Sequence, residues 1–126
     1  MVGIVLVSHS AALARGLAEL LAQVAGGAPV EPAGGGPDGG LGTDAELVRA
    51  AIGRAERGDG VMVLADLGSA LLTVRALLED FPPGRVRLAD APLVEGAVAS
   101  AVVAAVGGTP DEVLAAAEEA RGARKL

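Results

Sequence analysis

The sequence predicts an α/β protein: a three-layer sandwich in which helices cover both faces of a mainly parallel, four-stranded sheet. Residues 4–7 and 61–65 are continuous aliphatic runs, the pattern of strands buried on both faces of a parallel sheet. Each run ends in a polar tip that is followed by apolar residues at helical spacing. Strands that alternate with helices in this way favour a parallel sheet. With 126 residues, the chain is expected to form a single domain over residues 1–126.

The first strand is expected over residues 4–7 and stops at Ser8. Ser10 belongs to the residue types that cap helix N-termini, so a helix is predicted to follow it. His9, the only histidine of the chain, therefore lies at a strand-to-helix turn. Turns at the carboxyl ends of parallel strands bind ligands, and the free N–H groups of the following helix favour an anion such as a phosphoryl group. The helix is predicted to bury an apolar face that consists of Leu13, Leu17, Leu20, Leu21 and Val24.

A weak strand and a glycine-rich loop come next. Residues 28–32 are expected to form a short edge strand, because Pro29 and Pro32 interrupt them. Residues 33–42 read as a flexible loop, and a loop of this length in a small domain is more often a functional lid than a linker. The alternative, a tolerated glycine-rich surface insertion, stays open.

Two further helices flank the second strong strand. Either Thr43 or Asp44 is predicted to cap a helix that ends near Gly58. Its apolar face consists of Leu47, Val48, Ala51, Ile52 and Ala55. The strand over residues 61–65 leads into the tip Asp66-Leu67-Gly68-Ser69, from which the next helix starts. The apolar positions of that helix are Leu71, Leu72, Val74, Leu77 and Leu78.

Three elements are expected in the C-terminal third. A shorter strand over residues 86–89 follows the helix break at Phe81-Pro82-Pro83-Gly84. Residues 93–106 are apolar nearly all round, so part of this helix is expected to meet another subunit. The segment Thr109-Pro110-Asp111-Glu112 carries the start signature of a helix with a capping box.

Right-handed crossovers limit the strand orders available to such a sheet. If the order is 2-1-3-4, the switch point falls between the first and third strands, and the tips that meet there carry His9 and Asp66. Two polar residues far apart in the sequence would then be neighbours.

Such a pair suits nucleophilic attack on phosphorus. Neutral imidazole is a good nucleophile near pH 7, provided that the attacking nitrogen is the unprotonated one. A carboxylate at Asp66 that accepts from Nδ1–H fixes this tautomer and leaves Nε2 of His9 free to attack. Hydrogen-bond donors for the phosphoryl oxygens are expected from Ser69 and Thr43 and from the backbone near Ser10 and Gly68.

Composition excludes several other functions. Ten basic and sixteen acidic residues give a net charge of −6, and Trp and Tyr are absent, so nucleic acid is not an expected partner. Without cysteine and with one histidine, neither a metal site nor any other cofactor is expected. The most apolar run, residues 96–108, is short of the roughly 20 residues that span a bilayer, and residues 2–7 are too short for a signal peptide. A cytoplasmic protein without membrane insertion is therefore predicted.

Ordinary structural roles are the alternative for the same residues. A lone histidine after a strand is often structural or simply on the surface, and Asp66 followed by Gly68 and Ser69 also suits a common turn or cap. A serine hydrolase is disfavoured because no Gly-x-Ser-x-Gly motif is present, and no Gly-Lys-Ser/Thr follows the glycine-rich loop as a Walker A motif requires.

Four ordered motifs resemble a known family over nearly the whole chain. They are Val7-Ser8-His9-Ser10, Gly42-Thr43-Asp44-Ala45, Asp66-Leu67-Gly68-Ser69-Ala70-Leu71-Leu72 and Ala91-Pro92-Leu93-Val94-Glu95-Gly96-Ala97. They resemble the phosphotransfer subunits of phosphoenolpyruvate-dependent dihydroxyacetone kinases. The phosphotransfer domain of that family is similar to the enzyme IIA domain of mannose-type sugar phosphotransferase systems, so a fold of that type is implied.

The resemblance implies a phosphotransferase component, a phosphohistidine carrier. His9 would accept a phosphoryl group from phospho-HPr and pass it to ADP bound to DhaL, and the rebuilt ATP would phosphorylate dihydroxyacetone on DhaK. Asp66 would orient the ring, with Ser69 and Thr43 as the phosphate neighbours. A homodimer is also implied. Larger members continue into HPr-like and enzyme I-like domains, so this chain, which ends at Leu126, is expected to use separate donor proteins.

Two alternatives remain beside this function. The first is an enzyme IIA of a mannose-type sugar system that donates to a IIB protein, although the sequences of residues 66–71 and 91–96 favour the dihydroxyacetone kinase subunits. The second is a non-catalytic regulatory or assembly module in which His9 is structural.

Overall fold

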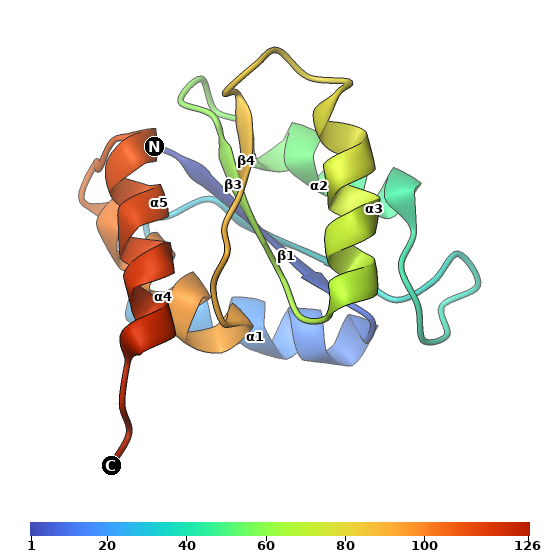
Figure 1. Cartoon of the computed structure of the whole chain (residues 1–126), viewed down its shortest axis with the longest axis horizontal. Coiled ribbons are helices and arrows are strands. Elements are labelled where there is room, and N and C mark those ends of the chain that lie inside the picture. Colours follow the sequence, from blue (N-terminus) through green and yellow to red (C-terminus); the bar gives the residue numbers. More distant parts are fainter.

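Four parallel strands form one sheet in the order β2-β1-β3-β4 in the computed structural model, which describes residues 1–126 (Figure 1). The strands are β1 (Gly3–Ser8), β2 (Val30–Gly34), β3 (Val61–Ala65) and β4 (Val86–Leu88). The predicted strand order is confirmed. The switch point therefore falls between β1 and β3.

Helices cover both faces of the sheet and complete the predicted three layers (Figure 1). They are α1 (Ala11–Val24), α2 (Ala45–Ala55), α3 (Gly68–Leu78), α4 (Leu93–Ala105) and α5 (Pro110–Glu119), and a 3-10 turn over Ala120–Gly122 follows the last of them. Helices α1, α4 and α5 pack on one face, whereas α2 and α3 pack on the other. None of these helices combines the length and the apolarity that crossing a membrane requires.

The two central strands are apolar throughout because each of their faces lies in a separate core. In β1, Ile4 and Leu6 point toward α1, α4 and α5, whereas Val5 and Val7 point toward α2 and α3. Side chains alternate between the faces of a strand, so a strand covered on both sides needs apolar residues at every position. This packing fixes β1 and β3 firmly and therefore fixes the tips at which they end.

Several helix boundaries follow from caps that the sequence carries. Ser10 caps α1 as predicted, and its side chain accepts the N–H of Leu13. Of the two candidates for α2, Asp44 is the cap, which leaves the hydroxyl of Thr43 available for another contact. Thr109 and Glu112 form both hydrogen bonds of the predicted capping box at α5.

Two strands differ from the prediction at their ends. β2 lies at residues 30–34 instead of 28–32, so the loop that follows is shortened to residues 35–42. β2 is an edge strand, as predicted, and Pro32 is accepted there because an edge strand needs only one partner for its backbone. β4 ends at Leu88, although the N–H of Ala89 still donates to the carbonyl of Val63.

The helices bury narrower faces than their leucine patterns predict. In α1 the buried stripe is Ala14, Leu17 and Leu21. The other predicted core positions are exposed at the flanks, where no further element covers them: Leu13, Leu20 and Val24 in α1, Leu47 in α2 and Leu72 in α3. Two boundaries also differ, because α2 ends at Ala55, before Gly58, and α3 begins at Gly68, so that Ser69 lies inside the helix.

Helix α4 is apolar nearly all round because the chain itself covers most of it. It packs between the sheet, α1 and α5, and its buried residues are small: Gly96, Ala97, Ser100, Ala101 and Ala104. A Cβ at Gly96 would lie 2.9 Å from side-chain atoms of Leu64 and Ala91, so only glycine allows this close approach. Burial within the chain accounts for only part of the pattern from which a second subunit was expected, because Val94, Val102 and Val106 stay exposed. The homodimer stays a prediction.

Candidate active site at the tips of β1 and β3

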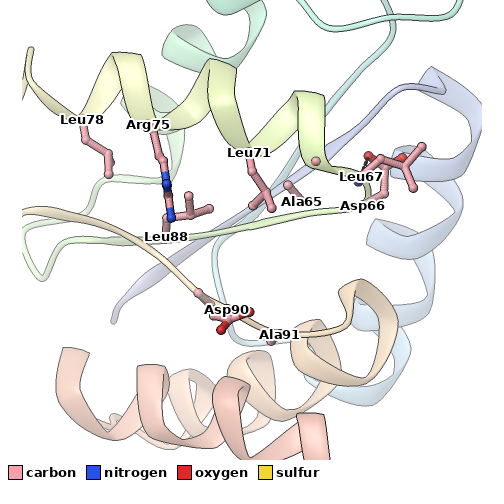
Figure 2. A pocket seen from close by; sticks show the side chains of 11 residues that line it. Ala65, Asp66, Leu67, Leu71, Arg75, Leu78, Leu88, Asp90 and Ala91 are labelled. Carbon is pink, nitrogen blue, oxygen red and sulfur yellow. Dashed lines mark hydrogen bonds between the residues drawn. The ribbon is translucent and has the colours of Figure 1, made fainter.

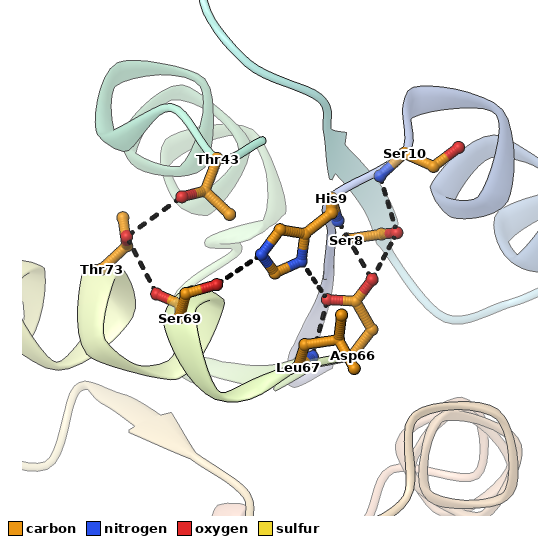
Figure 3. A network of polar contacts seen from close by, with 8 residues as sticks. All are labelled: Ser8, His9, Ser10, Thr43, Asp66, Leu67, Ser69 and Thr73. Atoms are coloured by element: carbon orange, nitrogen blue, oxygen red, sulfur yellow. Dashed lines mark hydrogen bonds and ion pairs between the residues drawn. The ribbon is translucent and has the colours of Figure 1, made fainter. Parts of the chain in front are cut away.

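The pairing of β1 and β3 brings together two turns that lie nearly sixty residues apart in the sequence. Val7 of β1 is in register with Ala65 of β3, so the residues that follow each of them emerge at the same edge of the sheet. The N–H of Asp66 donates to the carbonyl of Val7 at 3.1 Å and extends the pairing by one step. His9 and Asp66 are therefore neighbours, as the strand order predicts (Figure 3).

Asp66 holds both the ring and the backbone of His9. Its Oδ1 lies 2.9 Å from Nδ1 of the ring, and its Oδ2 accepts the backbone N–H of His9 at 3.0 Å (Figure 3). A carboxylate only accepts, so Nδ1 carries a proton, and in the neutral ring Nε2 carries the lone pair. The side chain of His9 is 24 % exposed, which leaves the Nε2 side of the ring within reach of a reactant.

Asp66 is kept charged by its hydrogen bonds. Burial alone would raise the pKa of this carboxyl group. The ring and the backbone N–H of His9, the hydroxyl of Ser8 at 2.8 Å and the N–H of Leu67 at 2.8 Å all donate to it, and together they lower its pKa below the ordinary value. At neutral pH the group is therefore a carboxylate, which orients the ring and favours positive charge on it.

Ser69 faces the other nitrogen of the ring. Its Oγ lies 2.5 Å from Nε2 of His9, and because Nε2 is the unprotonated nitrogen, the hydroxyl donates to it (Figure 3). Ser69 is the second residue of α3, and the N–H groups of Gly68 and Ser69 make no hydrogen bond within the protein. One hydroxyl and two free backbone donors thus lie at the start of a helix, beside the nucleophilic nitrogen.

The two other predicted phosphate neighbours do not touch the ring of His9. The hydroxyl of Ser10 accepts the N–H of Leu13, and its own N–H donates to Oγ of Ser8 at 3.0 Å. The hydroxyl of Thr43 lies 3.2 Å from Oγ1 of Thr73. The structure thus brings together His9, Asp66 and Ser69 and places Ser10 and Thr43 one residue further out, so contacts from those two to phosphate stay predictions.

Sequence reasoning missed three contributors to the site. Ser8 is buried and donates to Asp66, whereas the sequence indicated only that the first strand stops there. The N–H of Gly42 donates to the carbonyl of His9 at 2.9 Å, so the glycine-rich loop is attached to the site. Thr73 bonds Ser69 and Thr43, and its position four residues after Ser69 on the same helix face was the signal that could have identified it.

A groove of about 400 Å³ begins at Asp66 and runs along α3 (Figure 2). Leu71, Leu78 and Leu88 contribute apolar walls, and Arg75 projects from α3 across Leu88. The groove adjoins the site at Asp66, but neither His9 nor Ser69 lines it. No cluster of three or more histidine, aspartate or glutamate side chains that could hold a metal ion occurs in the chain.

This arrangement places a histidine that is hydrogen-bonded to a carboxylate at the switch point of a parallel sheet, with free backbone donors beside it. A family model described as the PTS system fructose IIA component (EIIA-man) matches residues 3–114. The chain belongs to this family of phosphotransferase-system IIA components.

Individual relatives narrow the comparison. The chain is 40% identical over 132 residues to the phosphoryl donor subunit DhaM of the PEP-dependent dihydroxyacetone kinase of Escherichia coli (strain K12), across 99% of this chain and 28% of that protein. It is 34% identical over 118 residues to a DhaM subunit, of PEP-dependent dihydroxyacetone kinase 2, from Listeria innocua serovar 6a, across 90% of this chain and 94% of that protein. The chain thus spans little more than a quarter of the longer relative and nearly all of the shorter one. The predicted resemblance to these subunits is confirmed.

A solved structure shares the fold. The crystal structure of EF1359, a protein of unknown function, matches with a TM-score of 0.87 and 34% identity, across 99% of this chain and 98% of that one. The predicted fold class is thereby confirmed at the level of the whole chain.

Proposed function

We propose that residues 1–126 act as one phosphotransfer domain that carries a phosphoryl group on Nε2 of His9. The observation that carries this proposal is the orientation of the ring: Nδ1 lies 2.9 Å from the carboxylate of Asp66, and the hydroxyl of Ser69 is the only hydrogen-bond partner of Nε2. A structural histidine has no need for a fixed tautomer with its free nitrogen at an open edge of the sheet. A nucleophile needs both.

The transfer is a displacement at phosphorus. The hydroxyl of Ser69 turns away from Nε2, and the lone pair of Nε2 attacks the phosphorus atom of the donor in line with the bond that breaks. The new P–N bond forms as the donor's bond breaks, and that electron pair returns to the donor. The ring becomes positively charged, and the carboxylate of Asp66 stabilises it through Nδ1–H. Transfer onward repeats these steps in reverse, with an oxygen of the acceptor as the nucleophile.

The phosphoryl oxygens would be held at the start of α3. The free N–H groups of Gly68 and Ser69 and the hydroxyl of Ser69 are donors at the positive end of a helix dipole. The backbone N–H of Ser10 and the hydroxyl of Thr43 are proposed as further contacts. To reach a phosphoryl oxygen, the N–H of Ser10 would have to leave Oγ of Ser8, and Thr43 would have to turn its hydroxyl away from Thr73.

Phospho-HPr is the proposed donor, and ADP bound to DhaL the proposed acceptor, for phosphorylation of dihydroxyacetone on DhaK. This makes the chain the phosphocarrier subunit of a phosphoenolpyruvate–glycerone phosphotransferase, working as a homodimer. Support comes from the relatives, which are described as phosphoryl donor subunits of PEP-dependent dihydroxyacetone kinases.

A second candidate is an enzyme IIA that donates to a IIB protein of a sugar system. It is favoured by the family model, whose description is the fructose IIA component. The two candidates share the chemistry at His9 and differ only in the acceptor, so one assay separates them.

The test is labelling from radioactive phosphoenolpyruvate with enzyme I and HPr. We expect an acid-labile phosphate on the wild-type chain, and because the chain has a single histidine, that label reports His9 alone. His9→Ala should carry none. Acid-labile label retained on His9→Ala would contradict the proposal. The labelled protein is then mixed with DhaL–ADP and DhaK or, separately, with a IIB protein. Loss of label to ADP supports the kinase subunit, and loss to IIB supports the sugar system.

A further inference from the structure

We propose that Thr73 is a positioning residue for phosphoryl transfer, because its hydroxyl closes a ring of hydrogen bonds that holds the glycine-rich loop and helix α3 at His9. The inference rests on the proposed function of His9 and extends it to Thr73, which does not contact the imidazole of His9. This ring of hydrogen bonds starts and ends at His9, and its two halves come from segments far apart in the sequence. Figure 3 shows the contacts from His9 through Ser69 and Thr73 to Thr43.

The first half of the ring passes through the loop. The carbonyl of His9 accepts the N–H of Gly42 at 2.9 Å, and the carbonyl of Ser8 accepts the N–H of Gly35 at 3.1 Å. Both ends of the loop are therefore attached to the residues of the β1 tip. Gly42 has a φ of 141°, a conformation that side-chain-bearing residues rarely adopt, so the chain turns here in a way that depends on glycine.

The second half of the ring passes through helix α3. Oγ1 of Thr73 lies 3.3 Å from the carbonyl of Ser69 and 3.2 Å from Oγ1 of Thr43. Thr73 has one hydroxyl proton and donates it to the Ser69 carbonyl, so Thr43 donates to Thr73. The bond within the helix fixes the direction of the Thr73 hydroxyl and aims its free acceptor at Thr43.

The ring then closes through the side chain of Ser69, which donates to Nε2 of His9. Thr73 is the only member that joins the loop half to the helix half. Without its hydroxyl, the donor of Thr43 is left without a partner, and nothing in the ring holds the Gly42 end of the loop against α3. The distance between the backbone of His9 and the hydroxyl of Ser69 would then vary more, which slows a reaction that needs both in place.

Thr73→Val tests this because it keeps the shape of the side chain and removes the hydroxyl. We expect a three- to tenfold lower kcat for phosphorylation of His9 by phospho-HPr, the range expected for one lost hydrogen bond. The KM for phospho-HPr should stay within about twofold, because Thr73 is half-buried between Thr43 and Ser69. Thr73→Ser restores the hydroxyl and should restore kcat.

Two controls separate positioning from stability and from direct phosphate binding. Thr109→Val also removes one threonine hydroxyl with its hydrogen bond, but at the start of α5, and should lower stability without lowering kcat. In the double variant Thr43→Val/Thr73→Val, the loss should be smaller than the product of the two single losses, because the two hydroxyls share one hydrogen bond. Losses that multiply, or a Thr73→Val enzyme with wild-type kcat, would overturn the proposal.

A measurement without phosphoryl transfer keeps this proposal distinct from the proposed function. Amide hydrogen exchange at Gly42 reports its bond to the His9 carbonyl, and Thr73→Val should accelerate this exchange at least threefold while leaving amides in β1 unchanged. Unchanged exchange at Gly42 overturns the role of Thr73 even if His9 is phosphorylated. Accelerated exchange in a chain that is never phosphorylated overturns the proposed function and leaves the ring of hydrogen bonds standing.

Discussion

The two turns that form the site begin their helices in opposite ways. At the β1 tip, Ser10 caps α1 with its own side chain, whose oxygen accepts the N–H of Leu13. At the β3 tip, the cap position of α3 is Leu67, which offers no side-chain acceptor, and the N–H groups of Gly68 and Ser69 stay free. The comparison teaches a division of labour: the capped turn presents His9, the proposed nucleophile, and the uncapped turn keeps backbone donors available for an anion.

The largest expected effect comes from the residue that joins the two turns. Asp66→Ala removes the acceptor of Nδ1–H, so the ring loses its tautomer and its orientation, and we expect phosphorylation of His9 to slow about 100-fold. A time course of quenched reactions with phospho-HPr measures the rate of phosphorylation, and circular dichroism checks that the strands and helices remain. Transfer at the wild-type rate would remove Asp66 from the mechanism.

A cap placed on α3 should make the two turns alike. Leu67 is 61 % exposed and extended, so Leu67→Ser costs no core packing and can accept the N–H of Ser69. We expect the free energy of unfolding in urea to rise by up to about 1 kcal/mol. Phosphoryl transfer should slow about fivefold, because the N–H of Ser69 is then no longer free to bind a phosphoryl oxygen. Leu72→Ser changes another exposed leucine, in α3 itself, and is the matched control. It should neither raise the free energy of unfolding nor slow phosphoryl transfer. Faster transfer in Leu67→Ser would contradict the role of the free donors.

At the β1 tip, the reverse change removes a helix cap. Ser10→Ala removes the cap of α1 and should cost about 1 kcal/mol of stability. Transfer should stay within about twofold, because the hydroxyl of Ser10 already accepts the N–H of Leu13, and the contact proposed from Ser10 to phosphate is through its backbone N–H. A tenfold loss of transfer would instead make the hydroxyl of Ser10 a direct phosphate contact.

The smallest effect is a pH dependence of stability. The pKa of Asp66 in the folded chain is lowered, although burial acts to raise it, because its hydrogen bonds outweigh burial. A lowered pKa stabilises the folded chain above the ordinary carboxyl pKa of about 4, and this contribution disappears as the pH falls through the folded value. The gap in unfolding free energy between wild type and Asp66→Asn should therefore be wider at pH 7 than at pH 3. Urea unfolding at the two pH values measures this, and an equal gap at both would contradict it.

The sequence predicts the part of the site that rests on the central strands. β1 and β3 are aliphatic at every position, so their ends are evident from composition, and the parallel order then makes His9 and Asp66 neighbours. Thr73 and Gly42 escape such reasoning, because their partners depend on the path of a glycine-rich loop that has no periodic pattern. The exposed flank of α1 was missed for a related reason: the leucine spacing indicates an apolar face, but only the packed fold decides how much of it is covered.

The hydroxyl of Ser69 on Nε2 has a consequence for the timing of transfer. It is the single group that must leave before phosphorus can approach, and a hydroxyl-bearing side chain at an exposed position changes rotamer within picoseconds to nanoseconds. Asp66, by contrast, is held by four donors and has no reason to move. In the proposed mechanism, no lid has to close before the reaction, and we expect the rate of transfer to follow the encounter with the phosphoryl donor and the chemical step itself.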